Sequence, residues 1–194
     1  LFVRTALKEV VQDYILNFVY NHKSYKKLIF TGGTCLRKIY GLPRHSEDLD
    51  FDFVEEFDIE KFMRDVEEYF ISELQYKEVE TKIAGNKKTL FIKFPGVTQD
   101  YKLFVRCDFS KESWADFGTE VNSVSAGEFS LFVLSYDLPT LFANKIISFL
   151  TREFFKGRKQ KISFKGRDLY DLVWFFGKFA KEGFSLEPRW SRVF

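Results

Sequence analysis

The segment DLDFDF at residues 48–53 constrains the fold more than any other part of the chain. Apolar residues alternate strictly with aspartates along it, as they do along a β-strand that buries one face and leaves the other open. Its leucine and phenylalanines predict a face that packs into a core. Its aspartates, beginning with Asp48 and Asp50, predict a face that meets solvent or a ligand. The rest of the chain has to supply a sheet around this strand.

Other patterns predict helices, further strands and a hairpin. Strands are expected at residues 28–31, 77–83, 89–94, 103–109 and 129–134, and Gly85-Asn86 predicts a turn between the second and third of these. Helices are expected at residues 2–21, 34–40, 138–152 and 167–181, and after an N-cap at Asp58. The buried stripe of the first helix is expected to consist of Val3, Leu7, Val10, Tyr14 and Phe18.

This order of elements favours an α+β fold in which helices flank a mixed β-sheet and the C-terminal part is helical. The polar stretch at residues 114–128 is a plausible boundary. We therefore expect a core at residues 1–125 that includes the N-terminal helix, and a C-terminal strand and helical part at residues 126–194.

Composition narrows the class of protein. Of the 194 residues, 45% are hydrophobic and 30% charged, so the chain can bury a core. No apolar run reaches the roughly 18 residues needed to cross a bilayer, and we expect no membrane partner. Cys35 and Cys107 match no zinc or disulfide spacing, which fits a cytoplasmic location. The net charge of +2 means that a polyanion would have to bind a local patch.

Two features of the sequence point to chemistry. Asp48 and Asp50 project the same way from one strand with Cα atoms about 6.6 Å apart, close enough to share a divalent cation, although exposed acids also occur on edge strands without a ligand. Upstream, Gly32, Gly33 and Thr34 lie between a strand and a helix. Such a turn lets the backbone approach a phosphate at the helix N-terminus, but a glycine pair is also found in simple tight turns.

The whole segment GGTCLRKIYGLPRHSEDLDFDF resembles the AbiEii/AbiGii-type nucleotidyltransferase toxins, a branch of the superfamily that includes DNA polymerase β and the aminoglycoside nucleotidyltransferases. Cys35 and His45 stand where small and aromatic residues are more usual. The family pattern of Gly-Gly-Thr, a short helix, Tyr-Gly, Arg and Ser-Glu-Asp-Leu-Asp-Phe matches Gly32, Gly33, Thr34, Tyr40, Gly41, Arg44 and residues 46–51.

The resemblance implies a nucleotidyltransferase-like sheet and a toxin of a toxin–antitoxin or phage-defence system. Such a toxin would transfer a nucleotide from a nucleoside triphosphate to RNA, with the tRNA 3′ end as the implied acceptor, and would have a cognate antitoxin. Mg²⁺ or Mn²⁺ would be held by Asp48, Asp50 and, from a later strand, Asp108, which could instead be an ordinary edge-strand acid. The nucleotide would be bound by Gly32, Gly33, Thr34, Arg44, Ser46 and Lys145.

Two residues in the C-terminal part match the family more weakly. Lys145 falls within the apolar stripe of its expected helix, where it either extends past the core to solvent or reaches the phosphates of a substrate. Asp168, in the segment RDLYDL at residues 167–172, either caps its helix or takes part in catalysis.

A basic loop offers an RNA site. Arg158, Lys159 and Lys161 belong to residues 152–167, in which Glu153 is the only acid, and they either bind RNA phosphates or are merely solvated. Two other functions compete with nucleotide transfer. One is an Asp-dependent phosphohydrolase, and the other is a non-catalytic module on the same fold that binds RNA or an antitoxin.

Overall fold

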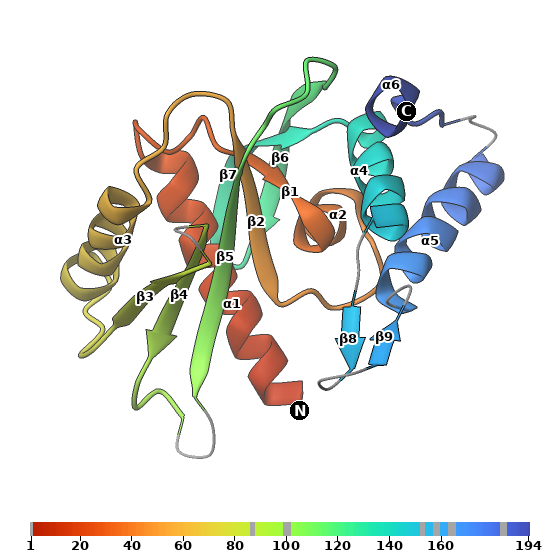
Figure 1. Cartoon of the computed structure of the whole chain (residues 1–194). Coiled ribbons are helices and arrows are strands. Elements are labelled where there is room, and N and C mark those ends of the chain that lie inside the picture. Colours follow the sequence, from red (N-terminus) through yellow and green to blue (C-terminus); the bar gives the residue numbers. More distant parts are fainter. Residues whose placement is uncertain are drawn as a thin grey trace. The chain divides into compact units, whose positions relative to one another are not determined.

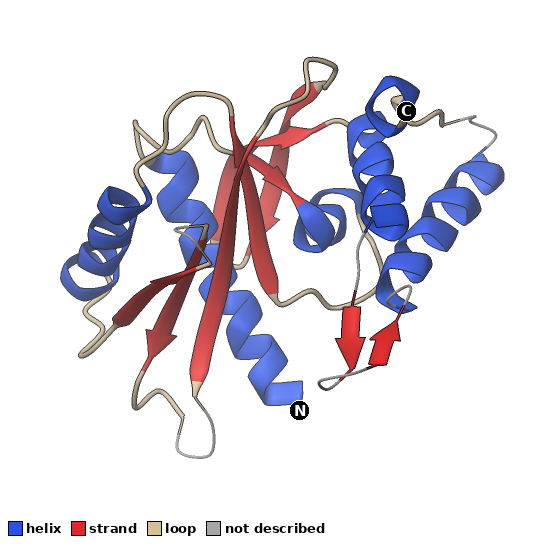
Figure 2. Cartoon of the chain, viewed as in Figure 1, coloured by secondary structure: helices blue, strands red, loops and turns tan. Residues whose placement is uncertain are grey.

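A mixed β-sheet organises the computed structural model, which describes residues 2–85, 88–98, 102–151, 154–156, 160–162, 166–182 and 186–194. Seven strands lie in the order β3-β4-β5-β2-β1-β7-β6 (Figures 1 and 2). They are β1 (Ile29–Thr31), β2 (Asp48–Phe53), β3 (Glu80–Ala84), β4 (Thr89–Phe94), β5 (Leu103–Lys111), β6 (Thr119–Ala126) and β7 (Phe129–Tyr136). Because β2 pairs antiparallel with β1 and parallel with β5, the sheet is mixed, which confirms the expected fold class.

The helices begin and end close to the expected residues. They are α1 (Phe2–Asn21), α2 (Gly32–Tyr40), α3 (Ile59–Glu68), α4 (Leu138–Thr151), α5 (Gly166–Glu182) and α6 (Trp190–Val193). Asp58 caps α3 as expected, since its carboxylate accepts from the backbone N–H of Glu60 at 2.9 Å and of Lys61 at 3.0 Å. A pair of three-residue strands, β8 (Phe154–Lys156) and β9 (Gln160–Ile162), was not expected.

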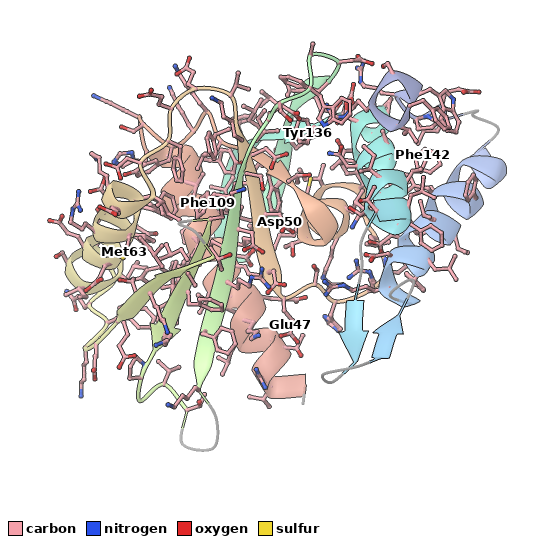
Figure 3. The ribbon with its side chains drawn as sticks, viewed as in Figure 1. Glu47, Asp50, Met63, Phe109, Tyr136 and Phe142 are labelled. Carbon is pink, nitrogen blue, oxygen red and sulfur yellow. The ribbon has the colours of Figure 1, made fainter. Side chains whose placement is uncertain are left out.

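Aromatic rings hold the apolar face of β2. Phe51 stacks on Phe109 of β5 with ring centroids 5.7 Å apart, and Phe109 meets Phe62 of α3 at 5.1 Å. Phe62 in turn contacts Phe18 of α1 at 5.6 Å, so both helices cover this face of the sheet. Asp48 and Asp50 consequently lie on the opposite face, and Figure 3 shows Asp50 and Phe109 on opposite sides of the central strands.

The buried face of α1 differs from the expected one. Val3 and Val10 are exposed, whereas Lys8 and Gln12 are buried. The inward face carries the buried Val11, Ile15, Leu16 and Val19 at the same helical spacing as Lys8 and Gln12, so it is rotated from the expected stripe. Phe18, at the end of the expected stripe, is buried. Residues 114–128, where a boundary was expected, also differ from the prediction, because they contain strand β6. An edge strand needs few apolar residues, and only Val124 and Ala126 of β6 are buried.

The chain forms two compact units. The first comprises residues 1–113 and 121–135, and the second residues 114–120 and 136–194. The boundary expected between residues 125 and 126 therefore falls inside β6, in the first unit. No helix among the described residues combines the length and the apolar character needed to cross a membrane.

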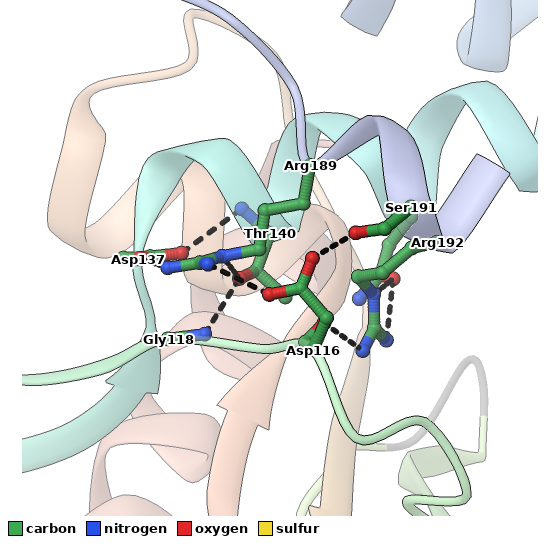
Figure 4. Close-up of polar contacts among 8 residues, drawn as sticks. Asp116, Gly118, Asp137, Thr140, Arg189, Ser191 and Arg192 are labelled. Atoms are coloured by element: carbon green, nitrogen blue, oxygen red, sulfur yellow. Dashed lines mark hydrogen bonds and ion pairs between the residues drawn. The ribbon is translucent and has the colours of Figure 1, made fainter.

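In the second unit, Arg189 joins three polar groups from two other segments (Figure 4). Its guanidinium donates to Asp137 at 2.6 Å, to Asp116 at 2.9 Å and to the hydroxyl of Thr140 at 2.8 Å. The carboxylate of Asp137, the residue before α4, also accepts a hydrogen bond from the backbone N–H of Thr140 at 2.9 Å. This set of contacts ties the residues before α6 to residues 114–120 and to the start of α4.

Asp137 makes these contacts depend on pH. Burial alone would raise the pKa of Asp137, but hydrogen bonds from Arg189 and Thr140 outweigh it and hold the pKa below the ordinary 3.8. Because the pKa is lower in the folded chain than in the unfolded chain, the ionised carboxylate stabilises the fold above pH 3.8. That stabilisation is lost as the pH falls through the folded pKa.

Replacing Arg189 by Met should therefore lower the thermal unfolding midpoint by several degrees near neutral pH and by less in acid. Unfolding curves at about pH 6 and about pH 3 would measure the difference. Lys27→Met is the control, because Lys27 pairs with Glu55 between side chains that are 68% and 74% exposed. An equal fall in the unfolding midpoint of Arg189→Met at both pH values would contradict the stabilising role of the ionised Asp137 carboxylate.

Candidate functional site

Three aspartates come together at the centre of the sheet. Asp48 and Asp50 share a face of β2, on either side of the buried Leu49. In the pairing register, Asp50 lies opposite Asp108 of β5 on one side and opposite Thr31 of β1 on the other. The backbone thus places Asp108 next to Asp50, as expected from the sequence.

The turn between β1 and α2 lies directly against Asp50. Gly32 has φ +77°, and a Cβ added there would come within 2.7 Å of the carboxyl carbon of Asp50. Thr34, in the same turn, donates its hydroxyl hydrogen to the backbone carbonyl of Asp48 at 2.5 Å. Only glycine fits at residue 32, because any side chain would be strained and would also collide with the acid. The turn is therefore fixed to both aspartate positions.

The loop before β2 reaches the same turn. A Cβ added to Gly33 would lie 2.8 Å from Nη2 of Arg44 and 2.9 Å from Oγ of Ser46. Arg37 of α2 donates to the backbone carbonyl of Arg44 at 3.2 Å. The side chains of Arg44 and Ser46 thus lie over the first turn of α2.

The first turn of α2 can bind an anion. Within residues 2–85, all of which the structure describes, the side chain of the N-cap residue Thr31 makes no capping hydrogen bond. The first backbone N–H groups of a helix have no partner within the helix, and they carry the positive end of its dipole. A phosphate beside Gly32 and Gly33 would meet these groups together with Arg44.

Asp108 is held by two neighbours that the sequence analysis did not assign to the site. Thr89 donates its hydroxyl hydrogen to Oδ1 of Asp108 at 2.6 Å, and Arg106 binds the carboxylate through Nε at 3.1 Å and Nη2 at 2.8 Å. Arg106 could have been found, because residues two apart on a strand share a face. No local sequence pattern identifies Thr89, because it reaches Asp108 through the antiparallel pairing of β4 with β5.

The charges of the three aspartates extend to the buried Cys107. Burial raises the pKa of its thiol well above 9.0, and the negative charges of Asp108, Asp50 and Asp48 raise it further. Cys107 therefore remains a neutral thiol.

The carboxylates suit a hard cation, but their side chains do not form a three-ligand group. Across the described part of the chain, no three His, Cys, Asp or Glu side chains are grouped closely enough to hold a metal ion. Mg²⁺ commonly takes one or two carboxylates and completes its shell with phosphate oxygens and water, so Asp48 and Asp50 fit it. The role of Asp108 as a third ligand stays a prediction.

Lys145 and Asp168 belong to the second unit. The ammonium of Lys145 forms an ion pair at 2.7 Å with Asp171 of α5, and the two side chains are only 13% and 0% exposed. This pair, and not an extension into solvent, explains a lysine within an apolar stripe. Asp168 lies in the first turn of α5, as expected, and is buried. Asp171 was missed, although it lies one helical turn after Asp168.

The structure describes only part of the basic loop. Arg158 and Lys159 lie outside the described residues, and Lys161 lies in β9 opposite Phe155. Their role in RNA binding stays a prediction.

Comparison with known families identifies the family to which this chain belongs. A profile described as nucleotidyl transferase AbiEii toxin, type IV toxin–antitoxin system, matches residues 18–187 of this chain. The chain belongs to the AbiEii nucleotidyltransferase toxin family. This confirms the resemblance found in the sequence. A search of curated proteins gave no match.

Solved structures share the fold of this AbiEii chain. MenT4, a nucleotidyltransferase toxin from Mycobacterium tuberculosis H37Rv, is 20% identical with a TM-score of 0.64, over 90% of this chain and 59% of MenT4. JHP933 from Helicobacter pylori is 19% identical with a TM-score of 0.57, over 93% of this chain and 69% of JHP933. The chain thus has the fold of these proteins and spans less than two thirds of the length of MenT4.

Gly32 and Gly41 offer a matched pair of substitutions. Both have a positive φ, of 77° and 76°, but a Cβ at Gly41 would meet nothing within 4 Å. Either change to Ala should cost about 1–2 kcal/mol of backbone strain. Gly32→Ala should in addition displace Asp50, and in the transfer reaction proposed below it should lower the rate by about 100-fold relative to Gly41→Ala. Thermal unfolding and a transfer assay would measure both effects, and equal activity of the two variants would contradict the role of the turn.

The buried ion pair predicts an unequal response to single and double substitution. Lys145→Met leaves the charge of Asp171 buried without its cation and should cost about 3 kcal/mol of unfolding free energy. Lys145→Met combined with Asp171→Leu removes both charges and should recover most of that loss. Denaturant unfolding measures the unfolding free energy of the two variants. A wild-type value for Lys145→Met would show that the ion pair does not contribute to stability.

Proposed function

We propose that this chain transfers a nucleotide from a nucleoside triphosphate to a hydroxyl of RNA, with the tRNA 3′ end as the acceptor. One observation carries the proposal: the Gly32 turn packs against Asp50 while Thr34 holds the backbone at Asp48. An anion-binding turn and a pair of acids are thereby fixed side by side, which is the arrangement that a triphosphate with a divalent cation requires.

In this proposal the turn binds the triphosphate. The first N–H groups of α2 donate to phosphate oxygens, and Arg44, which lies over Gly33, adds a positive charge. Ser46 contributes a hydroxyl at the same place. Together these groups stabilise the negative charge that develops on the departing pyrophosphate.

Asp48 and Asp50 would hold Mg²⁺ or Mn²⁺, which when bound supplies neutralisation of the triphosphate charge. Asp108 would accept the proton of the attacking hydroxyl, whose oxygen forms a bond to the α-phosphorus as pyrophosphate leaves. Arg106 and Thr89 orient Asp108 for this step through the hydrogen bonds described above.

The remaining assignments extend the proposal. Lys145 would contact the nucleotide and Asp168 would support catalysis, while Arg158, Lys159 and Lys161 would bind RNA. The double variant of Lys145 and Asp171 tests the first of these, since a structural lysine predicts recovery of both stability and transfer. A phosphate contact predicts recovery of stability alone. A cognate antitoxin and a cytoplasmic location follow from family membership as further expectations.

The decisive experiment incubates the chain with tRNA, Mg²⁺ and each α-labelled nucleoside triphosphate and measures label in the RNA. Asp48→Asn and Asp50→Asn should each lower transfer at least about 100-fold, with unfolding free energy changed by only about 0.5 kcal/mol. Asp52→Asn, on the same face of β2, is the matched control and should retain transfer. Release of inorganic phosphate without labelled RNA would favour a phosphohydrolase, and RNA binding without turnover would favour a binding module.

A further inference from the structure

We infer that α1 positions the nucleotide-binding loop, with Lys8 and Gln12 as the positioning residues. The loop is residues 43–47, which carry Arg44 and Ser46 and lead directly into Asp48. The functional part of this inference rests on the proposed function, whereas the structural part concerns the loop alone. Both parts lie within the first compact unit.

Lys8 and Gln12 point inward from α1 toward the loop. Lys8 is 3% exposed and Gln12 is 1% exposed, which is costly for polar side chains unless they have partners. The ammonium of Lys8 pairs with the carboxylate of Glu47 and lies 4.7 Å from the ring centroid of Phe104. The amide of Gln12 donates to the backbone carbonyl of Ser46 at 3.1 Å. Two successive loop residues are thus held by one face of α1.

The same helix also holds α2, whose first turn forms the other side of the site. Glu9 pairs with Arg37 of α2 at 2.8 Å and contacts His45 of the loop at 3.1 Å. Asp13 of α1 pairs with Lys38 of α2. Because Arg44 and Ser46 must lie over Gly33 to meet a phosphate, fixing the loop and α2 to one helix fixes their separation.

The α1 side of these contacts lies before the range that the family profile matches, whereas their partners at residues 37, 38 and 45–47 lie within it. The family profile matches from residue 18 onward, and every α1 residue named above precedes it. A helix that served only to cover the sheet would place apolar side chains at positions 8 and 12. Lys8 and Gln12 contribute little net stability over apolar residues of similar size, but their contacts specify where the loop lies.

The geometry of the Lys8–Glu47 pair allows the inference to be tested by a substitution that should not unfold the chain. The side chain of Lys8 is 4% exposed, whereas that of Glu47 is 52% exposed. Lys8→Met therefore fills the same space and leaves Glu47 in contact with water, so no charge is stranded in the core. Gln12→Met similarly keeps the packing and removes the hydrogen bond to Ser46. Both variants should stay folded.

Two measurements on the full chain test the inference. Hydrogen exchange should speed up about 10-fold at the amides of residues 44–47 in Lys8→Met and in Gln12→Met, because the loop opens locally, while exchange in α3 stays unchanged. The affinity for a non-hydrolysable nucleoside triphosphate with Mg²⁺ should fall about 10-fold, because the loop must then be ordered on binding. Lys8→Arg keeps the charge and should retain most of the affinity, and Lys27→Met should behave as wild type.

The outcomes separate the inference from the proposed function. Unchanged loop exchange in both Met variants would overturn the inference, as would faster exchange with unchanged nucleotide affinity. If the wild-type chain fails to bind the nucleotide, the proposed function fails, and the claim that α1 positions a nucleotide site fails with it. In that case, hydrogen exchange at the loop amides would still show whether α1 orders residues 43–47.

Discussion

The backbone at residue 32 lies so close to the carboxylate of Asp50 that no side chain can occupy that position. This close approach sets the distance between the start of α2 and the centre of the sheet. Thr34 then fixes the same turn to the backbone at Asp48, and Gly33 leaves room for Arg44 and Ser46. A larger residue at position 32 would separate the helix N-terminus from the acids, and the two would no longer face a single ligand.

Strand β2 can present acids on one face because its other face secures it in the fold. The rings of Phe51, Phe109 and Phe62 form consecutive contacts that link β2 to β5 and α3. Such aromatic pairs contribute about 0.5–1.5 kcal/mol each beyond the area that they bury. The aspartate face therefore does not have to supply folding energy.

Sequence patterns predicted the parts of the fold that local spacing determines. The strand at residues 48–53 and the cap at Asp58 follow from alternation and from one carboxylate before a helix, and both are confirmed. Long-range partners were not predictable in this way. The hydroxyl of Thr89 reaches Asp108 only through strand pairing, and β6 was missed because an edge strand buries few side chains.

Two helices expose some apolar residues and bury charged ones, and in both the buried charge has a partner of opposite charge. In the first unit α1 buries Lys8 and exposes Val10, and in the second unit α5 buries Asp171 and exposes Phe176. In α1 the inward face also carries the buried Val11, Ile15, Leu16 and Val19, so Lys8 and Gln12 extend an apolar face. Lys8 has a partner in Glu47, and Asp171 has one in Lys145. We interpret both ion pairs, the buried one of Lys145 with Asp171 and the half-exposed one of Lys8 with Glu47, as fixing which residues each helix presents to its neighbours. In α1 the residues so presented are those that hold the loop before Asp48, so one inward face of this helix serves both the apolar core and the candidate site.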